Sequence, residues 1–130
     1  MNENDRHLYQ ISGIVLALGA VVLGAFGAHA LKDTLIAENS VSVWETAVRY
    51  QMWHALGLLL LSLFPKNQSP SKAVGRCLIA GTFLFSGSLY LLAIGGPRWL
   101  GPITPIGGLL LIAGWALFLF SVCKACNVKS

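Results

Sequence analysis

Charged side chains are scarce in this chain, and their scarcity excludes an ordinary water-soluble fold. Asp, Glu, Lys and Arg make up only 11% of the 130 residues, against about 25% in a typical soluble domain. The hydrophobic share is 55%, and the apolar residues stand in long blocks instead of the stripes of an amphipathic surface helix. Because lipid solvates such blocks and water does not, the composition predicts an integral membrane protein.

Runs of basic residues and paired cysteines are missing as well. The net charge is +4, but the nine Lys and Arg residues are scattered, which argues against a nucleic-acid-binding surface. Three cysteines are an odd number and argue against a secreted disulfide framework. The sequence has no glycine-rich phosphate-binding loop, and we expect no cofactor. The expected partners are the lipid bilayer and a second copy of the chain or another membrane protein.

Four long apolar stretches are present. A helix needs about 20 mostly apolar residues to cross about 30 Å of hydrocarbon. The stretches that satisfy this condition lie at about 8–31, 43–64, 70–95 and 105–126. We therefore predict an all-α fold in which residues 1–130 form one domain, a bundle of four transmembrane helices. The longest predicted loop follows the first helix, and Ser42 with Glu45 has the spacing of a capping box at the start of the second.

The distribution of Lys and Arg predicts the orientation. If both ends of the chain lie in the cytoplasm, six of these residues fall on the cytoplasmic side and three on the other. The cytoplasmic set is Arg6, Lys66, Lys72, Arg76, Lys124 and Lys129, and the opposite set is Lys32, Arg49 and Arg98. The positive-inside rule therefore favours an N-in, C-in topology.

A cleaved signal peptide is the competing interpretation of the first stretch. Residues 28–30 resemble an A-x-A cleavage site after an apolar run. However, the run is longer than the usual core of about 7–15 residues, and two acidic residues accompany Arg6 in front of it. We therefore favour a retained helix.

Small residues follow one face of the first stretch and recur in the fourth. They are Gly13, Ala17, Ala20, Gly24, Gly27 and Ala28, and then Gly107 and Gly114. On a helix the first six fall within about 100° of arc. Such a face lets helix backbones approach closely. We expect it to pack inside the same bundle, with homodimerisation as the alternative.

The second stretch contains Glu45, Arg49 and His54 and is the most informative of the four. Glu45 and Arg49 are spaced i, i+4, so an ion pair can form on one helix face. Tyr50 and His54 share another face at the same spacing. His54 lies about 15 Å from the start of this helix. Ionisable groups at such depth are costly unless they are paired or hydrated, which makes them candidate functional residues.

We predict that the external halves of the helices bring a polar cluster together. Its members are His29, Glu45, Arg49, Tyr50, Gln51, His54, Ser86, Ser88, Tyr90 and Thr104. The functional interpretation is a site for a small polar molecule, a lipid headgroup or a proton. The alternative is a set of interhelical hydrogen bonds that fix the packing, worth about 0.6 kcal/mol each. For the serines we prefer this alternative, and for Glu45, Arg49 and His54 both interpretations stay open.

Metal binding has little support in the sequence. No H-E-x-x-H spacing is present, so we assign no metal to the polar cluster. Cys123 and Cys126 form a single C-x-x-C, with Cys77 and His7 predicted on the same side of the membrane. Four such ligands suit tetrahedral zinc. We prefer ordinary juxtamembrane thiols, for which acylation is one modification.

Four motifs, in order along the chain, resemble a known family. They are residues 24–31 (GAFGAHAL), 50–56 (YQMWHAL), 85–90 (FSGSLY) and 103–108 (ITPIGG), followed by Ala113-Gly114-Trp115. Together they resemble the YgdD/YwdK-like family of small bacterial inner-membrane proteins, a domain family of unknown function (number 423) with a eukaryotic relative, transmembrane protein 256. The resemblance covers essentially all four stretches. It implies a multi-pass protein of the cell's inner (plasma) membrane and no particular activity, substrate or cofactor.

From these features we expect a protein that binds a small ligand or a lipid headgroup at the polar cluster. A subunit that binds another membrane protein through the small-residue face ranks second. A membrane enzyme or a proton- or ion-handling protein ranks third, because no nucleophile and base stand at a recognisable spacing.

Overall fold

Helices form nearly all of the part of the chain that can be described. The computed structural model describes the backbone of residues 1–64 and 70–127, and the side chains as far as residue 125. The long helices are α1 (Glu3–Ala28), α3 (Val41–Ser62), α4 (Lys72–Ala93) and α5 (Ile103–Asn127). A short helix, α2 (Lys32–Ala37), and a 3-10 turn, η2 (Arg98–Leu100), lie between them. The described residues thus confirm the all-helical fold.

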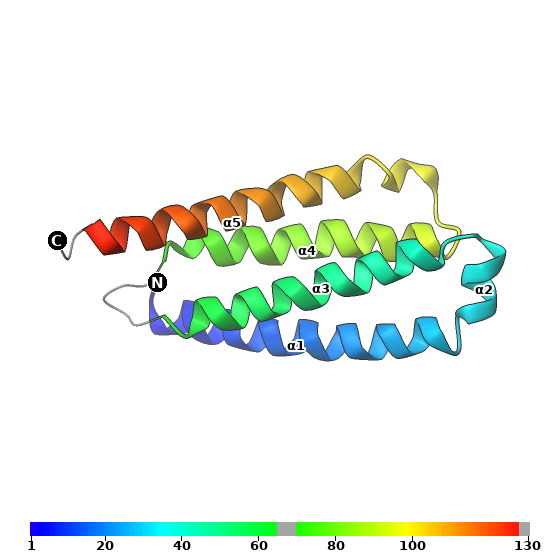
Figure 1. The fold of residues 1–130 in the computed structure, drawn as a ribbon, viewed down its shortest axis with the longest axis horizontal. Coiled ribbons are helices and arrows are strands. Elements are labelled where there is room, and N and C mark those ends of the chain that lie inside the picture. The colour runs from blue at the N-terminus through cyan, green and yellow to red at the C-terminus, as the bar shows by residue number, and fades with distance from the viewer. Residues whose placement is uncertain (65–69, 128–130) are drawn as a thin grey trace.

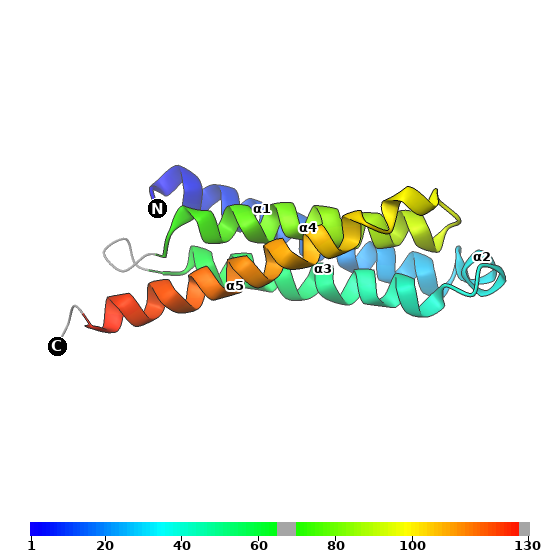
Figure 2. The same ribbon diagram turned by 90° about the horizontal axis from the view of Figure 1, so that it is seen from above.

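The long helices run antiparallel to their neighbours. The main contacts join α1 to α3, α3 to α4, and α4 to α5 (Figure 1). Helix α5 runs obliquely to α4 when the molecule is seen from above (Figure 2). Helix α1 begins and α5 ends at one end of the molecule, whereas α2 and η2 lie at the other (Figure 1). We call the end that carries α2 the α2 end.

Local capping explains where two of the long helices begin. The Asn2 side chain accepts from the Asp5 amide at 2.8 Å, and the Asp5 carboxylate accepts from the Asn2 amide at 3.3 Å. This capping box starts α1 five residues before the predicted boundary. At α4, the Ser71 hydroxyl accepts from the Ala73 amide at 3.2 Å. The helix therefore begins at Lys72 and not at the predicted residue 70.

The predicted capping box of Ser42 and Glu45 is wrong. The N-cap of α3 is Ser40, and its side chain makes no capping hydrogen bond. The Ser40 hydroxyl instead donates to the Ala93 carbonyl at 2.6 Å. A tertiary contact with the end of α4 therefore uses the hydroxyl that would otherwise cap the helix.

The predicted loop between the first two long helices contains α2. Its Leu35 is 1% exposed and packs in a small core with Trp44 and Ala93. The main core lies nearer the other end and joins side chains of α1, α3, α4 and α5, among them Tyr9, Leu58 and Leu78. Helix α3 contributes to both cores because it lies between α1 and α4.

Three helical segments in the described residues are long and apolar enough to cross a membrane. They are α1, α4 and Arg98–Ala125, which contains most of α5. Helix α3 is not among them, because residues such as Glu45, Arg49 and His54 lower its mean hydropathy. Crossing by α3 therefore stays a prediction.

Candidate functional site

The predicted polar cluster divides into buried hydrogen bonds, an exposed ion pair and a histidine. Gln51 of α3, 7% exposed, belongs to the first group. Its Nε2 donates to the Leu16 carbonyl of α1 at 2.8 Å. Its Oε1 accepts from the Tyr90 hydroxyl of α4 at 2.9 Å. Both ends of this amide are used in joining helices, so neither is directed at a ligand site.

The serines of α4 also join helices. The Ser86 hydroxyl donates to the Ala47 carbonyl of α3 at 2.8 Å. Ser88 and Thr104 share a hydrogen bond of 2.6 Å that links α4 to the first turn of α5. Such interhelical hydrogen bonds are what the packing interpretation of the serines predicts.

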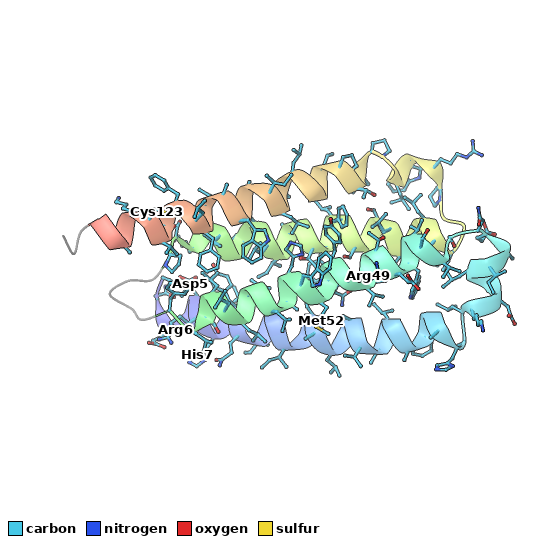
Figure 3. All side chains as sticks on the ribbon, viewed as in Figure 1. Asp5, Arg6, His7, Arg49, Met52 and Cys123 are labelled. Atoms are coloured by element: carbon cyan, nitrogen blue, oxygen red, sulfur yellow. The ribbon has the colours of Figure 1, made fainter. Side chains whose placement is uncertain are left out.

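Glu45 and Arg49 form an ion pair on the outer surface of α3. The Arg49 Nη2 lies 3.0 Å from the Glu45 Oε2, and the two side chains are 61% and 55% exposed. In Figure 3, Arg49 lies toward the α2 end, whereas Asp5, Arg6 and His7 lie toward the opposite end. Because both side chains are exposed, the pair is separate from the buried hydrogen bonds.

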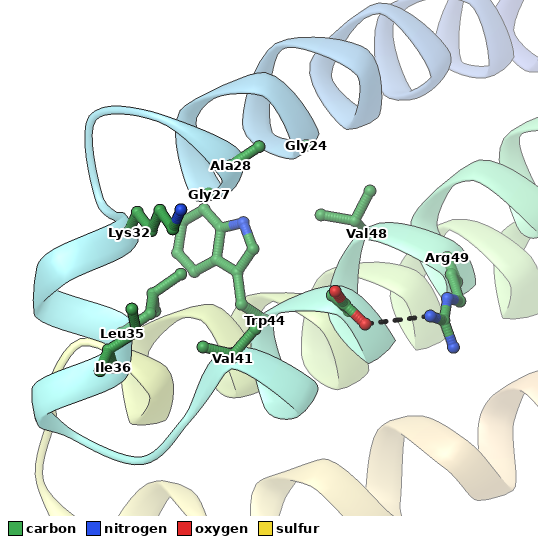
Figure 4. Close-up of a pocket in the computed structure, with 11 residues that line it drawn as sticks. Gly24, Gly27, Ala28, Lys32, Leu35, Ile36, Val41, Trp44, Val48 and Arg49 are labelled. Atoms are coloured by element: carbon green, nitrogen blue, oxygen red, sulfur yellow. Dashed lines mark hydrogen bonds and ion pairs between the residues drawn. The ribbon is translucent and has the colours of Figure 1, made fainter.

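The ion pair borders a groove between α1, α2 and α3, which we call the outer groove. Its volume is about 410 Å³. The lining residues are Gly24, Gly27, Ala28, Lys32, Leu35, Ile36, Val41, Trp44, Glu45, Val48 and Arg49. Lys32 and Arg49 lie at its opposite ends, with the Trp44 indole between them (Figure 4). The groove thus combines apolar walls with two cations and one carboxylate.

A second groove, which we call the aromatic groove, lies between α3 and α5. Its volume is about 740 Å³. The lining residues are Tyr50, Trp53, His54, Phe85, Gly108, Leu111, Ile112, Trp115, Ala116 and Leu119. The Tyr50 ring packs against Phe85 and stacks on His54, with ring centroids 4.5 Å and 5.8 Å away. His54 is the only one of these lining residues that carries an ionisable imidazole.

His29 lies apart from both grooves. It is exposed at the end of α1, where its amide donates to the carbonyls of Ala25 and Phe26. Its side chain lines a surface hollow with Ala25, Phe26 and Ala30. The structure therefore does not bring His29 together with the other predicted cluster residues.

Most of the predicted small residues pack within the chain. Ala20 is fully buried, Ala17 packs against the main core, and Gly24 faces Val48 of α3. A Cβ atom added at Gly13 would lie 2.9 Å from the Ala55 carbonyl oxygen of α3.

The remaining small residues have similar surroundings, with one exception. A Cβ atom added at Gly27 would overlap the Trp44 indole, and one at Gly114 would lie 3.0 Å from Leu78 of α4. Gly107 meets the backbone of Phe85. Ala28 is exposed at the outer groove.

The thiols do not gather in the described part of the chain. Cys77 is partly buried on α4 and Cys123 is exposed on α5. No three His, Cys, Asp or Glu side chains among the described residues are placed to hold a metal ion. The side chain of Cys126 lies outside the described residues.

Sequence reasoning missed two residues that shape the outer groove, Trp44 and Lys32. Trp44 is 5% exposed, and its Nε1 donates to the Leu23 carbonyl of α1 at 2.9 Å. Lys32 was counted only as a topology signal. The i, i+4 spacing of Trp44 and Val48 on the face next to Glu45 was the available signal. It does not reveal that α2 folds over this face.

Comparison with known proteins gives the family. Residues 23–108 match the family model described as a protein of unknown function, DUF423. A UPF0382 membrane protein of Staphylococcus haemolyticus is 46% identical over 118 residues, which cover 90% of this chain and 96% of that protein. The UPF0382 membrane protein YwdK of Bacillus subtilis is 41% identical over 120 residues, covering 90% and 97%.

A eukaryotic relative is also similar. A UPF0382 membrane protein of Schizosaccharomyces pombe is 42% identical over 105 residues, which cover 77% of this chain and 88% of that protein. No solved structure matches the chain significantly. The chain belongs to the DUF423 family, whose members in bacteria and yeast are membrane proteins of unknown function.

Proposed function

We propose that this chain is a four-span protein of the inner (plasma) membrane that binds the phosphate headgroup of an anionic lipid. The proposed site is the outer groove. The observation that carries the proposal is the composition of this groove, in which apolar walls lie between two cationic side chains, Lys32 and Arg49. An acyl chain fits the walls, and the positive charge of the two side chains attracts a phosphate group.

The packing of α3 supports a fourth crossing. Its 22 residues span about 33 Å at 1.5 Å per residue, enough for the hydrocarbon core. It contacts α1 and α4, two of the helices that are apolar enough to cross. Its buried polar side chains, Gln51, His54 and Ser62, have hydrogen-bond partners inside the protein, which a membrane interior requires.

The position of the basic residues supports the N-in, C-in orientation. Helix α1 begins and α5 ends at the same end of the molecule (Figure 1). The helix segments nearest that end carry Arg6, Lys72, Arg76 and Lys124, whereas Lys32, Arg49 and Arg98 belong to the α2 end. Lys66 and Lys129 lie outside the described residues. The positive-inside rule then places the outer groove in the external half of the membrane.

The charges around the outer groove suit a phosphate group. Lys32, Arg49 and Glu45 sum to one net positive charge at the groove. The ion pair occupies one nitrogen of the Arg49 guanidinium, which leaves further N–H donors for a phosphate oxygen. An exposed i, i+4 ion pair stabilises a helix by only about 0.3–0.5 kcal/mol. The small contribution of this ion pair to fold stability therefore does not explain why it lies beside the outer groove.

Lipid competition tests the proposal. The protein is placed in nanodiscs with equal amounts of phosphatidylglycerol and phosphatidylcholine that carry the same acyl chains, and retained lipid is measured by native mass spectrometry. We expect the wild type to retain phosphatidylglycerol preferentially. Lys32→Gln and Arg49→Gln should each lower this preference about fivefold, because one cation near an anionic headgroup contributes about 1 kcal/mol.

Arg98→Gln is the matched control, because Arg98 is exposed at the same end but does not line the outer groove. It should leave the preference unchanged. Equal retention of the two lipids by the wild type contradicts the proposal. So does an Arg98→Gln effect as large as that of Arg49→Gln. Displacement of the lipid by inorganic phosphate alone would assign the groove to a free anion instead of a lipid.

A further inference from the structure

The aromatic groove lies near the middle of the membrane-crossing region. Trp115 is at the midpoint of α5, twelve residues from each of its ends, Ile103 and Asn127. Phe85, which also lines the groove, lies well inside α4. None of the lining residues is Lys, Arg, Asp or Glu. A phospholipid headgroup is therefore a poor occupant, because its charge would move from the membrane interface into a groove where no charged side chain pairs with it.

The walls of this groove are suited to a flat ring. Trp53 and Trp115 are 54% and 41% exposed, although they are large aromatic side chains. Trp115 also stacks on Phe118, with ring centroids 5.9 Å apart, which limits its rotation. Aromatic rings favour offset or edge-to-face contact with another ring. A planar ring therefore gains more from these walls than a flexible acyl chain does.

His54 supplies a directed hydrogen-bond acceptor. Its Nδ1 lies 2.6 Å from the Tyr50 carbonyl oxygen. A carbonyl only accepts, so Nδ1 carries the hydrogen, and Nε2 of the neutral ring is an acceptor. His54 is 5% exposed, and Nε2 makes no hydrogen bond with any residue of the described chain. Every fully buried side-chain nitrogen or oxygen among the described residues has a hydrogen-bond partner. Because Nε2 has none, it is not fully buried, and it is accessible from the groove that His54 lines.

We propose that the aromatic groove binds a lipophilic phenol, the chemistry of a hydroquinone headgroup. The phenol hydroxyl donates to Nε2 of His54, and its ring lies against Tyr50, Phe85 and Trp115. The indole N–H groups of Trp53 and Trp115 and the Tyr50 hydroxyl are the other polar groups of the lining residues. The hydroxyl is the feature that distinguishes this ligand from an acyl chain or a helix of a second copy. The proposal is independent of lipid binding in the outer groove.

A pair of probes that differ only in the hydroxyl tests the proposal. They are 4-nonylphenol and its methyl ether, 4-nonylanisole, titrated into nanodiscs that contain the full chain. Partition into empty nanodiscs is subtracted. We expect the phenol to bind about fivefold more tightly than the ether, the effect of one net hydrogen bond. In His54→Phe the two affinities should be equal, because the acceptor is lost while the ring is kept.

Two further variants separate the role of His54 from a folding defect. His29→Phe changes an exposed histidine outside the groove and should keep the preference for the phenol. Ala116→Leu fills the groove from an exposed position of α5 and should weaken both probes. Equal binding of the probes by the wild type overturns the proposal in favour of an acyl chain. Absence of binding, or a preference that persists in His54→Phe, overturns it as well.

Discussion

Gln51 connects three helices through one side chain. It extends from α3 to the Leu16 carbonyl of α1 and to the Tyr90 hydroxyl of α4. If α3 crosses the membrane as proposed, no water is available in the hydrocarbon core to replace either hydrogen bond. The amide therefore specifies how α1 and α4 are positioned along α3, in addition to its contribution to stability.

Removing this amide should destabilise the fold measurably. We expect Gln51→Leu to lower the free energy of unfolding by about 1–2 kcal/mol, because two hydrogen bonds are lost and the Tyr90 hydroxyl loses its partner. Tyr90→Phe should cost about 0.5–1 kcal/mol. Reversible unfolding in bicelles measures both. The double variant should cost less than the sum of the two, since they share one hydrogen bond, and strict additivity would contradict this account.

At the scale of helices, close approach of α4 and α5 depends on Gly107. A Cβ atom added at this position would overlap the backbone of Phe85. Backbone atoms do not rotate away as a side chain does, so only a shift of one helix relieves the overlap. The Ser88–Thr104 hydrogen bond is formed at the same helix pair and depends on the same separation.

Gly107→Ala should therefore lower the free energy of unfolding by about 1–3 kcal/mol, the usual cost of overpacking. Gly87→Ala is the matched control on α4, because a Cβ atom added there meets nothing within 4 Å. Its unfolding free energy should equal that of the wild type or exceed it, since Ala favours the helix. Thermal unfolding in the same detergent compares the two. Equal losses would show that helix packing at Gly107 is not the cause.

At the scale of the whole molecule, the helices pack in a row rather than around a closed centre. The main contacts lead from α1 through α3 and α4 to α5. In this order α3 and α5 are not direct neighbours and meet through side chains such as His54 and Trp115, whose ring centroids lie 6.1 Å apart. The aromatic groove lies between these two helices. The outer surface is strongly apolar, with Leu18 at 64% and Leu109 at 66% exposure, as lipid requires and water does not permit.

Site-directed labelling tests the crossing by α1 and the N-in orientation together. In a variant without Cys77, Cys123 and Cys126, single cysteines replace Asn4 or Glu38, both exposed and at opposite ends of the molecule. A membrane-impermeant maleimide added to intact cells should label the Glu38→Cys protein only. Both proteins should react after the membrane is permeabilised. Labelling of Asn4→Cys in intact cells would contradict the N-in orientation.

Part of this architecture is readable from the chain. The uncharged run from residue 7 to 31 and the proline and glycine residues near 95–102 predict long helices and the connection before α5, because period and turn chemistry are local properties. Helix α2 was not predicted. Its six residues are too few for a periodic signal, and packing of Leu35 against Trp44 and Ala93 stabilises it.

The predicted polar cluster likewise contains one contact that the sequence predicts and others that it does not. The i, i+4 spacing of Glu45 and Arg49 correctly predicted their ion pair, since helix geometry alone decides that contact. Spacing does not reveal which way a side chain faces across a bundle. His29 therefore lies away from the cluster, and Gln51 is occupied by neighbouring helices.

The amino-acid sequence by itself determined that this protein is helical, that it belongs in a membrane and which family it resembles. Each of these properties follows from composition, from residues close together in the chain or from short motifs. The tertiary structure decided that the polar residues separate into packing contacts and two distinct grooves. The physical reason for this separation is that hydrogen bonds between α1, α3, α4 and α5 join residues from 16 to 63 positions apart. No local sequence pattern predicts such contacts.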